Sequence, residues 1–165
     1  MDDVTCVVTD APCVAIGAPN VTLELNGFTM TGQADPQTAC NGGGSGVEIG
    51  IDVNAQIGVD IRGPGLVKQF RGHGIRLLSS SGATITGMTT STNCFSGIFV
   101  VGGSDHHLHG NLSVRNGNAS NPCAYDWLAA PAATGSVGTG LVEMESWSRE
   151  TTSASVSSVP AIPET

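Results

Sequence analysis

The sequence predicts an all-β fold, a right-handed single-stranded parallel β-helix of about four to five coils with capping ends. Composition is the first reason. Of 165 residues, 39% are hydrophobic, 12% are charged and 23 are glycine, which favours short strands and turns over a coiled coil or a charged helical bundle. The second reason is an internal repeat of 23 to 24 residues, the length of one coil in a stacked solenoid.

Four segments carry the repeat, each alternating apolar with polar residues and ending in glycine. They are residues 21–27, 57–63, 83–87 and 106–110. Their glycines lie 36, 24 and 23 residues apart, and the first gap equals one repeat of 24 plus an insertion of 12. Period-two alternation predicts strands, and strands this short bury their apolar faces when successive coils stack. Parallel crossovers are almost always right-handed, which predicts the hand of the coil.

The repeat also predicts which residues stack in columns, about 4.8 Å apart along the solenoid. An interior stack is expected from Val59, Ile61, Ile85 and Leu108. An amide (asparagine) ladder is expected from Gln69, Asn93 and Asn116, each six residues after a repeat glycine. A second strand slot follows at residues 75–78 and 98–101, with residues 47–51 in the same slot one coil earlier.

The chain is expected to divide into four parts. Residues 1–20 form an N-terminal cap, 21–120 the β-helix coils, 121–145 a C-terminal cap, and 146–165 a flexible tail rich in Ser, Thr and Pro. Caps are needed because the end coils of a solenoid otherwise leave open core and strand edges. The tail composition is typical of a linker.

Five cysteines without a CxxC pair favour disulfides over a thiolate metal site and indicate an exported protein, extracellular or periplasmic. We expect Cys6 to pair with Cys13 and Cys40 with Cys123, leaving Cys94 as an interior free thiol. The sequence starts Met1-Asp2-Asp3, without a signal peptide. No apolar run is long enough for a membrane span.

Charge is distributed unevenly along the chain. The formal net charge is −8, and residues 1–61 contain eight acids and no Lys or Arg. Acidity argues against a nucleic-acid partner. Residues 62–115 hold most of the basic side chains, and we expect these to contact an acidic polysaccharide: Arg62, Lys68, Arg71, Arg76 and Arg115. Lys68 is expected to share a column with Thr92 and Arg115. The alternative is that these cations only keep the solenoid soluble.

The densest titratable cluster is residues 104–109, from which we take Asp105, His107 and His109 as candidate catalytic residues. Alternation on a strand points His107 and His109 outward and His106 and Leu108 inward. An outward histidine pair can act as general base or bind zinc or copper, with Asp105 as third ligand. The alternative is a plain polar surface.

The register predicts what the histidines stack on. We expect His107 over Thr84 and Asp60, and His109 over Thr86 and Arg62. Glu24 is expected one coil from Asp60 in the same column, where two carboxylates can bind calcium or form an acid–base pair.

Three stretches carry a family resemblance: Val21-Thr-Leu-Glu-Leu-Asn-Gly-Phe-Thr-Met-Thr-Gly32, Asn93-Cys-Phe-Ser-Gly-Ile98 and Gly110-Asn-Leu-Ser-Val-Arg-Asn116. They resemble right-handed parallel β-helix repeat proteins of the pectate-lyase-like superfamily, and the resemblance covers roughly residues 14–118. It implies the fold. It also implies functions that range from polysaccharide lyases, hydrolases and epimerases to phage tailspikes, without the catalytic signature of one enzyme family.

The functional hypothesis is therefore a secreted β-helix protein that binds or acts on an acidic polysaccharide, as a lyase, epimerase or hydrolase would. The alternative is a non-catalytic structural or adhesion module, or a fragment of a longer solenoid. No cofactor is required by either hypothesis, and a divalent metal (calcium, zinc or copper) is the remaining option.

Overall fold

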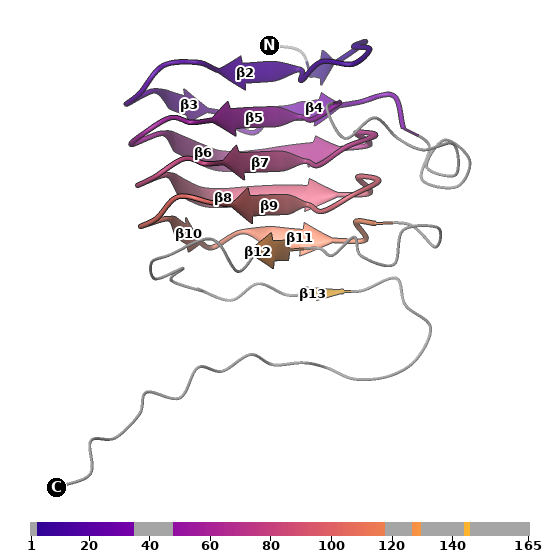
Figure 1. Cartoon of the computed structure of the whole chain (residues 1–165). Coiled ribbons are helices and arrows are strands. Elements are labelled where there is room, and N and C mark those ends of the chain that lie inside the picture. Colours follow the sequence, from indigo (N-terminus) through magenta and orange to yellow (C-terminus); the bar gives the residue numbers. More distant parts are fainter. Residues whose placement is uncertain (1–2, 35–47, 118–126, 130–143, 146–165) are drawn as a thin grey trace, which may run out of the picture.

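The computed structural model of the 165-residue chain describes residues 3–34, 48–117, 127–129 and 144–145. All regular structure in these residues is β, and the strands pair in parallel. Successive coils stack into a β-solenoid of about four turns (Figure 1). The predicted parallel β-helix is confirmed. Among the described residues, no helix long and apolar enough to cross a membrane is found.

The strands form two sheets that run along the stack. The first sheet contains β1 (Val4–Thr5), β3 (Thr22–Glu24), β4 (Thr29–Thr31), β6 (Asp60–Lys68), β8 (Thr84–Ser91), β10 (His107–His109), β11 (Leu112–Val114) and β13 (Met144–Glu145). The second sheet contains β2 (Val14–Ile16), β5 (Ile51–Asn54), β7 (Ile75–Leu78), β9 (Ile98–Val101) and β12 (Trp127–Ala129). The expected N-terminal cap, residues 1–20, contributes β1 and β2.

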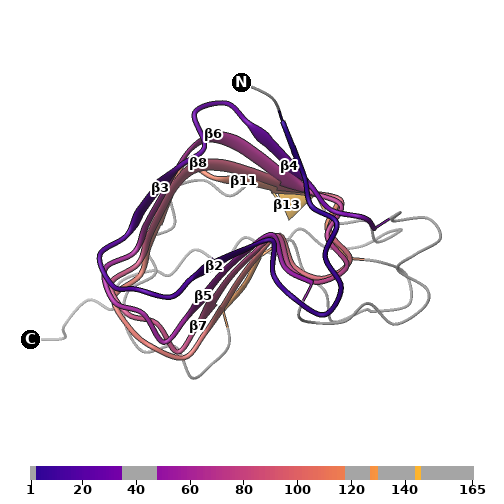
Figure 2. The same ribbon diagram turned by 90° about the horizontal axis from the view of Figure 1, so that it is seen from above.

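Seen along the stack, the first sheet bends at a corner, with β3 on one side and β4 on the other (Figure 2). Strands β6 and β8 run through this corner, and the repeat glycines lie at it. Gly87 has a positive φ of 65°. A Cβ atom at Gly63 would collide with the carbonyl oxygen of Gly87. The corner therefore requires glycine where backbones of successive coils approach most closely.

The corner differs in length from coil to coil. Four residues separate the paired positions Glu24 and Thr29, and three separate the equivalent Arg62 and Leu66. In the next two coils the number falls to two, as between His109 and Leu112. The shift in pairing between Arg62 and Gly65 marks one such extra residue.

Inward-facing side chains stack into a continuous core. Leu23, Ile61, Ile85 and Leu108 are paired in one column, and Ile61 and Ile85 are fully buried. The predicted interior stack is thus confirmed, with Val59 buried beside it. On the second sheet, isoleucines at the start of β5, β7 and β9 stack in the same way. The slot expected for residues 47–51 therefore starts only at Ile51.

The amide ladder exists, but with different members from those expected. Asn93 and Asn116 are buried, and the Nδ2 of Asn93 donates to the Oδ1 of Asn116 at 2.8 Å. Gln69 is not part of the ladder. Because of the extra corner residue in β6, the position one coil before Asn93 is Phe70, whose N–H donates to the Oδ1 of Asn93 at 3.0 Å.

The same extra residue corrects the expected column of Lys68. Lys68 pairs with Ser91, which in turn pairs with Val114. It does not share a column with Thr92 and Arg115. Counting from Gly63 therefore misplaces the residues of β6 beyond the corner by one position.

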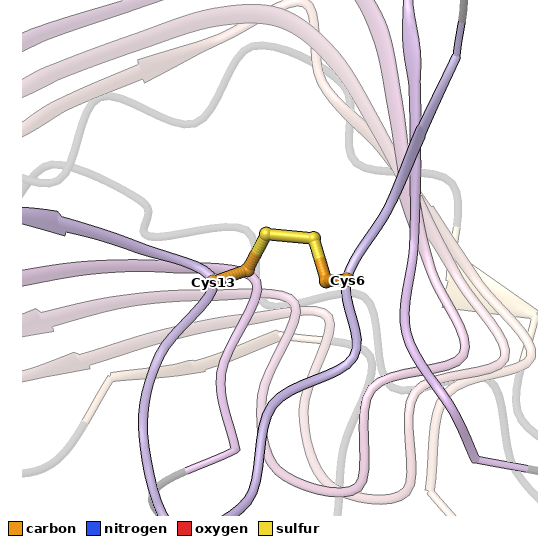
Figure 3. Close-up of a disulfide and its surroundings, with 2 residues drawn as sticks. All are labelled: Cys6 and Cys13. Atoms are coloured by element: carbon orange, nitrogen blue, oxygen red, sulfur yellow. A yellow bond between two sulfur atoms is a disulfide. The ribbon is translucent and has the colours of Figure 1, made fainter.

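A disulfide links Cys6 to Cys13, as predicted, and closes the loop that leads from β1 into β2 (Figure 3). Cys94 is buried as expected, but it is disulfide-bonded, so the expectation of a free thiol was wrong. Cys40 and Cys123 lie outside the described residues. So do the expected C-terminal cap and tail, apart from β12 and β13.

The ladder makes a testable difference between two neighbouring amides. Replacing Asn93 by Ala leaves the buried N–H of Phe70 without its acceptor and removes the side-chain donor to the carbonyl of Val67. We expect the free energy of unfolding in urea to fall by about 3 kcal/mol. Gln69→Ala should stay within about 0.5 kcal/mol of the wild type. Equal losses from both variants would contradict the observed ladder.

Candidate functional site

The candidate site lies on the outer face of the first sheet, on the side of the corner formed by β3, β10 and the first halves of β6 and β8. Its outward side chains form two columns. One column is Thr22, Asp60, Thr84 and His107, and the other is Glu24, Arg62, Thr86 and His109. The predicted stacking of His107 and His109 is confirmed, and both side chains are exposed.

Glu24 corrects one expectation about these columns. It pairs with Arg62 in the column of His109, whereas Thr22 pairs with Asp60. The expected stack of Glu24 on Asp60 was wrong because aligning the two repeat glycines misplaces Glu24 by two residues. Gly27 comes three residues after Glu24, whereas Gly63 directly follows Arg62. A calcium site or acid–base pair made of two stacked carboxylates therefore does not form here.

Arg62 is instead held between those two carboxylates. Its Nε donates to Asp60 Oδ2 at 2.8 Å, and its Nη1 lies 3.4 Å from Glu24 Oε1. The hydrogen bond and charge of Asp60 raise the pKa of Arg62 further above its usual value. The guanidinium charge is thus balanced within the protein, which reduces what Arg62 can offer to an anionic ligand.

A shallow hollow of about 500 Å³ lies beside this ion pair. It is lined by Asp60, Arg62, Gly63, Pro64, Thr84, Thr86 and Gly87. Gly63, Gly87 and the ring of Pro64 form the apolar part of its wall. The Asp, Arg and Thr side chains around them provide hydrogen-bond donors and acceptors. The hollow therefore combines an apolar surface with hydrogen-bonding groups in the way that ligand pockets do.

The predicted trio of Asp105, His107 and His109 does not form a metal site. Asp105 lies in the turn before β10, where its Oδ2 accepts a hydrogen bond from Ser104 Oγ at 2.8 Å. Within the described ranges, no group of three or more His, Cys, Asp or Glu side chains could hold a metal ion. The two histidines thus remain as outward polar groups, above Thr84 and Thr86.

The basic residues are spread around the solenoid rather than gathered on one face. Arg76 lies on the outer face of the second sheet and makes a bidentate pair with Asp52, at 2.8 and 2.9 Å. Arg71 lies in the turn before that sheet and contacts Glu48 at 3.3 Å. Lys68 ends β6, and Arg115 occupies a turn after β11. With Arg62, three of the five predicted contact residues are already ion-paired.

His106 is buried, as its inward position predicts, and replaces the Val59 and Ala83 of earlier coils. Neither of its ring nitrogens makes a hydrogen bond. Burial lowers the pKa of His106, and the nearby backbone of Gly102 and Ser80 opposes part of this shift. A buried imidazole without partners is costly, so this residue weakens the coil that contains it.

A cluster on the outer face of the second sheet was not predicted from the sequence. The ring of His73 stacks on Phe99, with centroids 4.3 Å apart and an angle of 4° between planes, and Phe95 lies 5.4 Å away. The Nδ1 of His73 accepts the N–H of Ser96 at 3.2 Å. The only signal in the sequence was that Asp52, Arg76 and Phe99 occupy equivalent positions of successive repeats.

The environment keeps His73 neutral. Burial lowers its pKa to about 4, and the charge of Arg76 adds to this while Asp52 opposes it. At neutral pH the ring is therefore an uncharged stacking partner for Phe99 and an acceptor for Ser96.

Comparison of the chain with known protein families, with curated proteins and with solved structures finds no match in any of the three. No match supports the expected resemblance to the pectate-lyase-like superfamily, and what the structure shows is a parallel β-solenoid of about four turns. Function has to be argued from the surface that this coil displays.

The histidines of β10 give a prediction about stability. We expect His106→Val to raise the free energy of unfolding by about 1 kcal/mol, because valine fills the same inward position in an earlier coil and removes two unpaired nitrogens. The double variant His107→Thr, His109→Thr should change it by less than about 0.5 kcal/mol. Urea denaturation of both variants measures this, and the reverse order would mean that the inward and outward faces are exchanged.

His73 gives a prediction about pH. Its folded-state pKa of about 4 lies below the 6.5 of an unfolded histidine. The unfolded chain therefore binds the extra proton first, and stability present above pH 6.5 is lost as the pH falls toward 4. The loss should reach about 3 kcal/mol, with His106 acting in the same direction. Urea unfolding between pH 7.5 and 4 should show a smaller loss for His73→Gln, and an unchanged slope would contradict this assignment.

Proposed function

We propose that the chain is an exported polysaccharide-binding β-solenoid, which holds a sugar chain on the outer face of β3, β6, β8 and β10. The observation that carries this proposal is the hollow beside Asp60 and Arg62. A sugar ring has an apolar face of C–H groups and a rim of hydroxyls. The surface of Gly63, Pro64 and Gly87 can contact the C–H face of the sugar, and the side chains of Asp60, Thr84 and Thr86 can hydrogen-bond to its hydroxyls.

The repeat supports a linear ligand rather than a single small molecule. Equivalent polar groups recur on this face at the spacing of the coils, about 4.8 Å. Thr22 and His107 lie in one column with Asp60 and Thr84 of the hollow, and they offer hydrogen-bonding groups one coil to either side of it. An extended polymer that runs along the stack can contact several of these rows at once.

Charge favours an uncharged polysaccharide over the acidic one expected from the sequence. The guanidinium of Arg62 is balanced by Asp60 and Glu24. The other four basic residues of the predicted contact surface lie elsewhere on the solenoid. Uronate lyase chemistry needs a cation for the sugar carboxylate beside a base, and the balanced Arg62 does not supply one on this face. The proposal is therefore a binding module.

The Cys6–Cys13 disulfide supports export, because disulfides persist in oxidising compartments. A surface rich in hydroxyls, imidazoles and paired charges is suited to contact with extracellular glycans.

The test is a panel of neutral and uronate polysaccharides, measured by affinity electrophoresis and calorimetry. Thr86→Trp fills the hollow and should weaken binding of the preferred polymer by more than about tenfold. Thr89→Trp is the matched control, since Thr89 is an outward threonine of similar burial on the same strand beyond the corner. It should bind as the wild type does.

Three outcomes would contradict the proposal. They are no binding to any polymer, equal losses in the two tryptophan variants, and release of unsaturated product from a uronate polymer, seen by its ultraviolet absorbance. The last would establish a lyase.

A further inference from the structure

The two ends of the solenoid differ in how well the core is covered. Leu23, in the first coil, is only partly buried, whereas Ile61 and Ile85 in the same column are fully buried. At the other end of the column, Leu108 is 3% exposed. Val14 and Val21 are partly buried like Leu23. The N-terminal end therefore leaves the core partly open, and the last described coil does not.

Backbone groups are also left over at this end. Within the described ranges, β1, β2 and β3 have no strand on their outer side. The N–H of Asp60 donates to the carbonyl of Val21, and the N–H of Leu25 donates to the carbonyl of Arg62. Because bonding alternates along a strand between its two neighbours, Thr22 and Glu24 direct their N–H and C=O groups away from β6. Both residues are exposed.

The rim of this end is apolar, and its charge has one sign. Val4 is 47% exposed and Val7 is 74% exposed. Residues 3–34 contain Asp3, Asp10 and Glu24 and no Lys or Arg. A second copy placed head to head would bring acid against acid. The charge instead favours an occupant that carries basic residues.

We propose that the N-terminal end of the solenoid binds an extended segment of another protein, with a basic residue opposite Glu24, which adds to β3 as a further parallel strand. The protein itself shows what such a strand needs, because β6 pairs with β3 from the other side. There Ile61 lies opposite Leu23 and Arg62 lies opposite Glu24. The partner segment therefore carries an apolar residue that covers Leu23, followed, one residue later, by a lysine or arginine that shares the exposed carboxylate of Glu24 with Arg62.

Strand addition supplies main-chain hydrogen bonds for affinity, and alternate side chains supply specificity. Here the main-chain partners are the outward groups of Thr22 and Glu24. The core residue Leu23 and the acidic side chain of Glu24 select the sequence of the partner segment. The outer edge of β3 is distinct from the hollow beside Pro64, although the side chains of Thr22 and Glu24 also belong to the outward columns described above. Strand addition at this edge does not depend on polysaccharide binding.

The probe is a fluorescent peptide with the sequence of residues 57–63, together with a second peptide in which the arginine is replaced by glutamate. Fluorescence anisotropy with the full chain should show saturable binding of the first peptide. Glu24→Lys should weaken this binding about fivefold and favour the second peptide, since like charges directly opposite destabilise a strand pair. Asp105→Lys is the matched control, an exposed acid far along the solenoid, and should change neither affinity.

Thr22→Pro is the second variant. It removes the outward N–H of β3 without removing a bond to β6, so the chain should keep its circular dichroism spectrum and lose the peptide. Absence of saturable binding to the wild type, or equal binding to Thr22→Pro, would overturn the proposal. It would also be overturned by a concentration-dependent dimer in sedimentation that Thr22→Pro abolishes, because the edge would then be covered by a second copy.

Discussion

Parallel pairing between successive coils is the constraint on which the rest of the structure depends. It places Ile85 directly on Ile61 in the core, and it therefore also places Thr84 on Asp60 and Thr86 on Arg62 outside. Inner and outer columns are not independent, since a slip of one residue would exchange them. The need to bury one face thus fixes which outward positions stack on one another, and the arrangement of the candidate site is a consequence of core packing.

How far the sequence predicts this arrangement depends on the corner. Within one straight run the alternation was sufficient, and it correctly placed Leu108 inside and His107 outside. Across the corner it failed for Gln69 and Lys68, because the corner of β6 has one residue more than that of β8. Before the corner it failed for Glu24, because the repeat glycine comes third in the first corner and first in the corner of β6. The repeat glycines mark where the corner lies, but glycine tolerates corners of several lengths and so does not reveal which is present.

Side-chain partners were harder to predict than side-chain directions. The pairing of Arg62 with Glu24 joins residues 38 apart in the sequence and requires the true corner length. The stack of His73 on Phe99 joins a turn of one coil to a strand of the next. Both contacts join residues that are far apart in the sequence, so no local sequence pattern predicts them. Charge counting along the chain therefore suggested a basic surface, whereas in space three of the five basic residues are matched by carboxylates.

Inward and outward columns place different demands on residue type, which explains why the repeat predicts the fold of this chain and not its function. Inward positions accept few residue types, and His106, which departs from them, is left without hydrogen bonds. Outward positions accept Asp, Thr and His in one column and Glu, Arg, Thr and His in the next, because no core contact depends on them. A repeat detected through its inward residues identifies the solenoid, but the proposed ligand contacts outward residues, which the repeat leaves free to vary. The outer columns and the first coil, whose outer strand edge has no paired strand within the described ranges, are therefore the surfaces on which the proposed ligands bind.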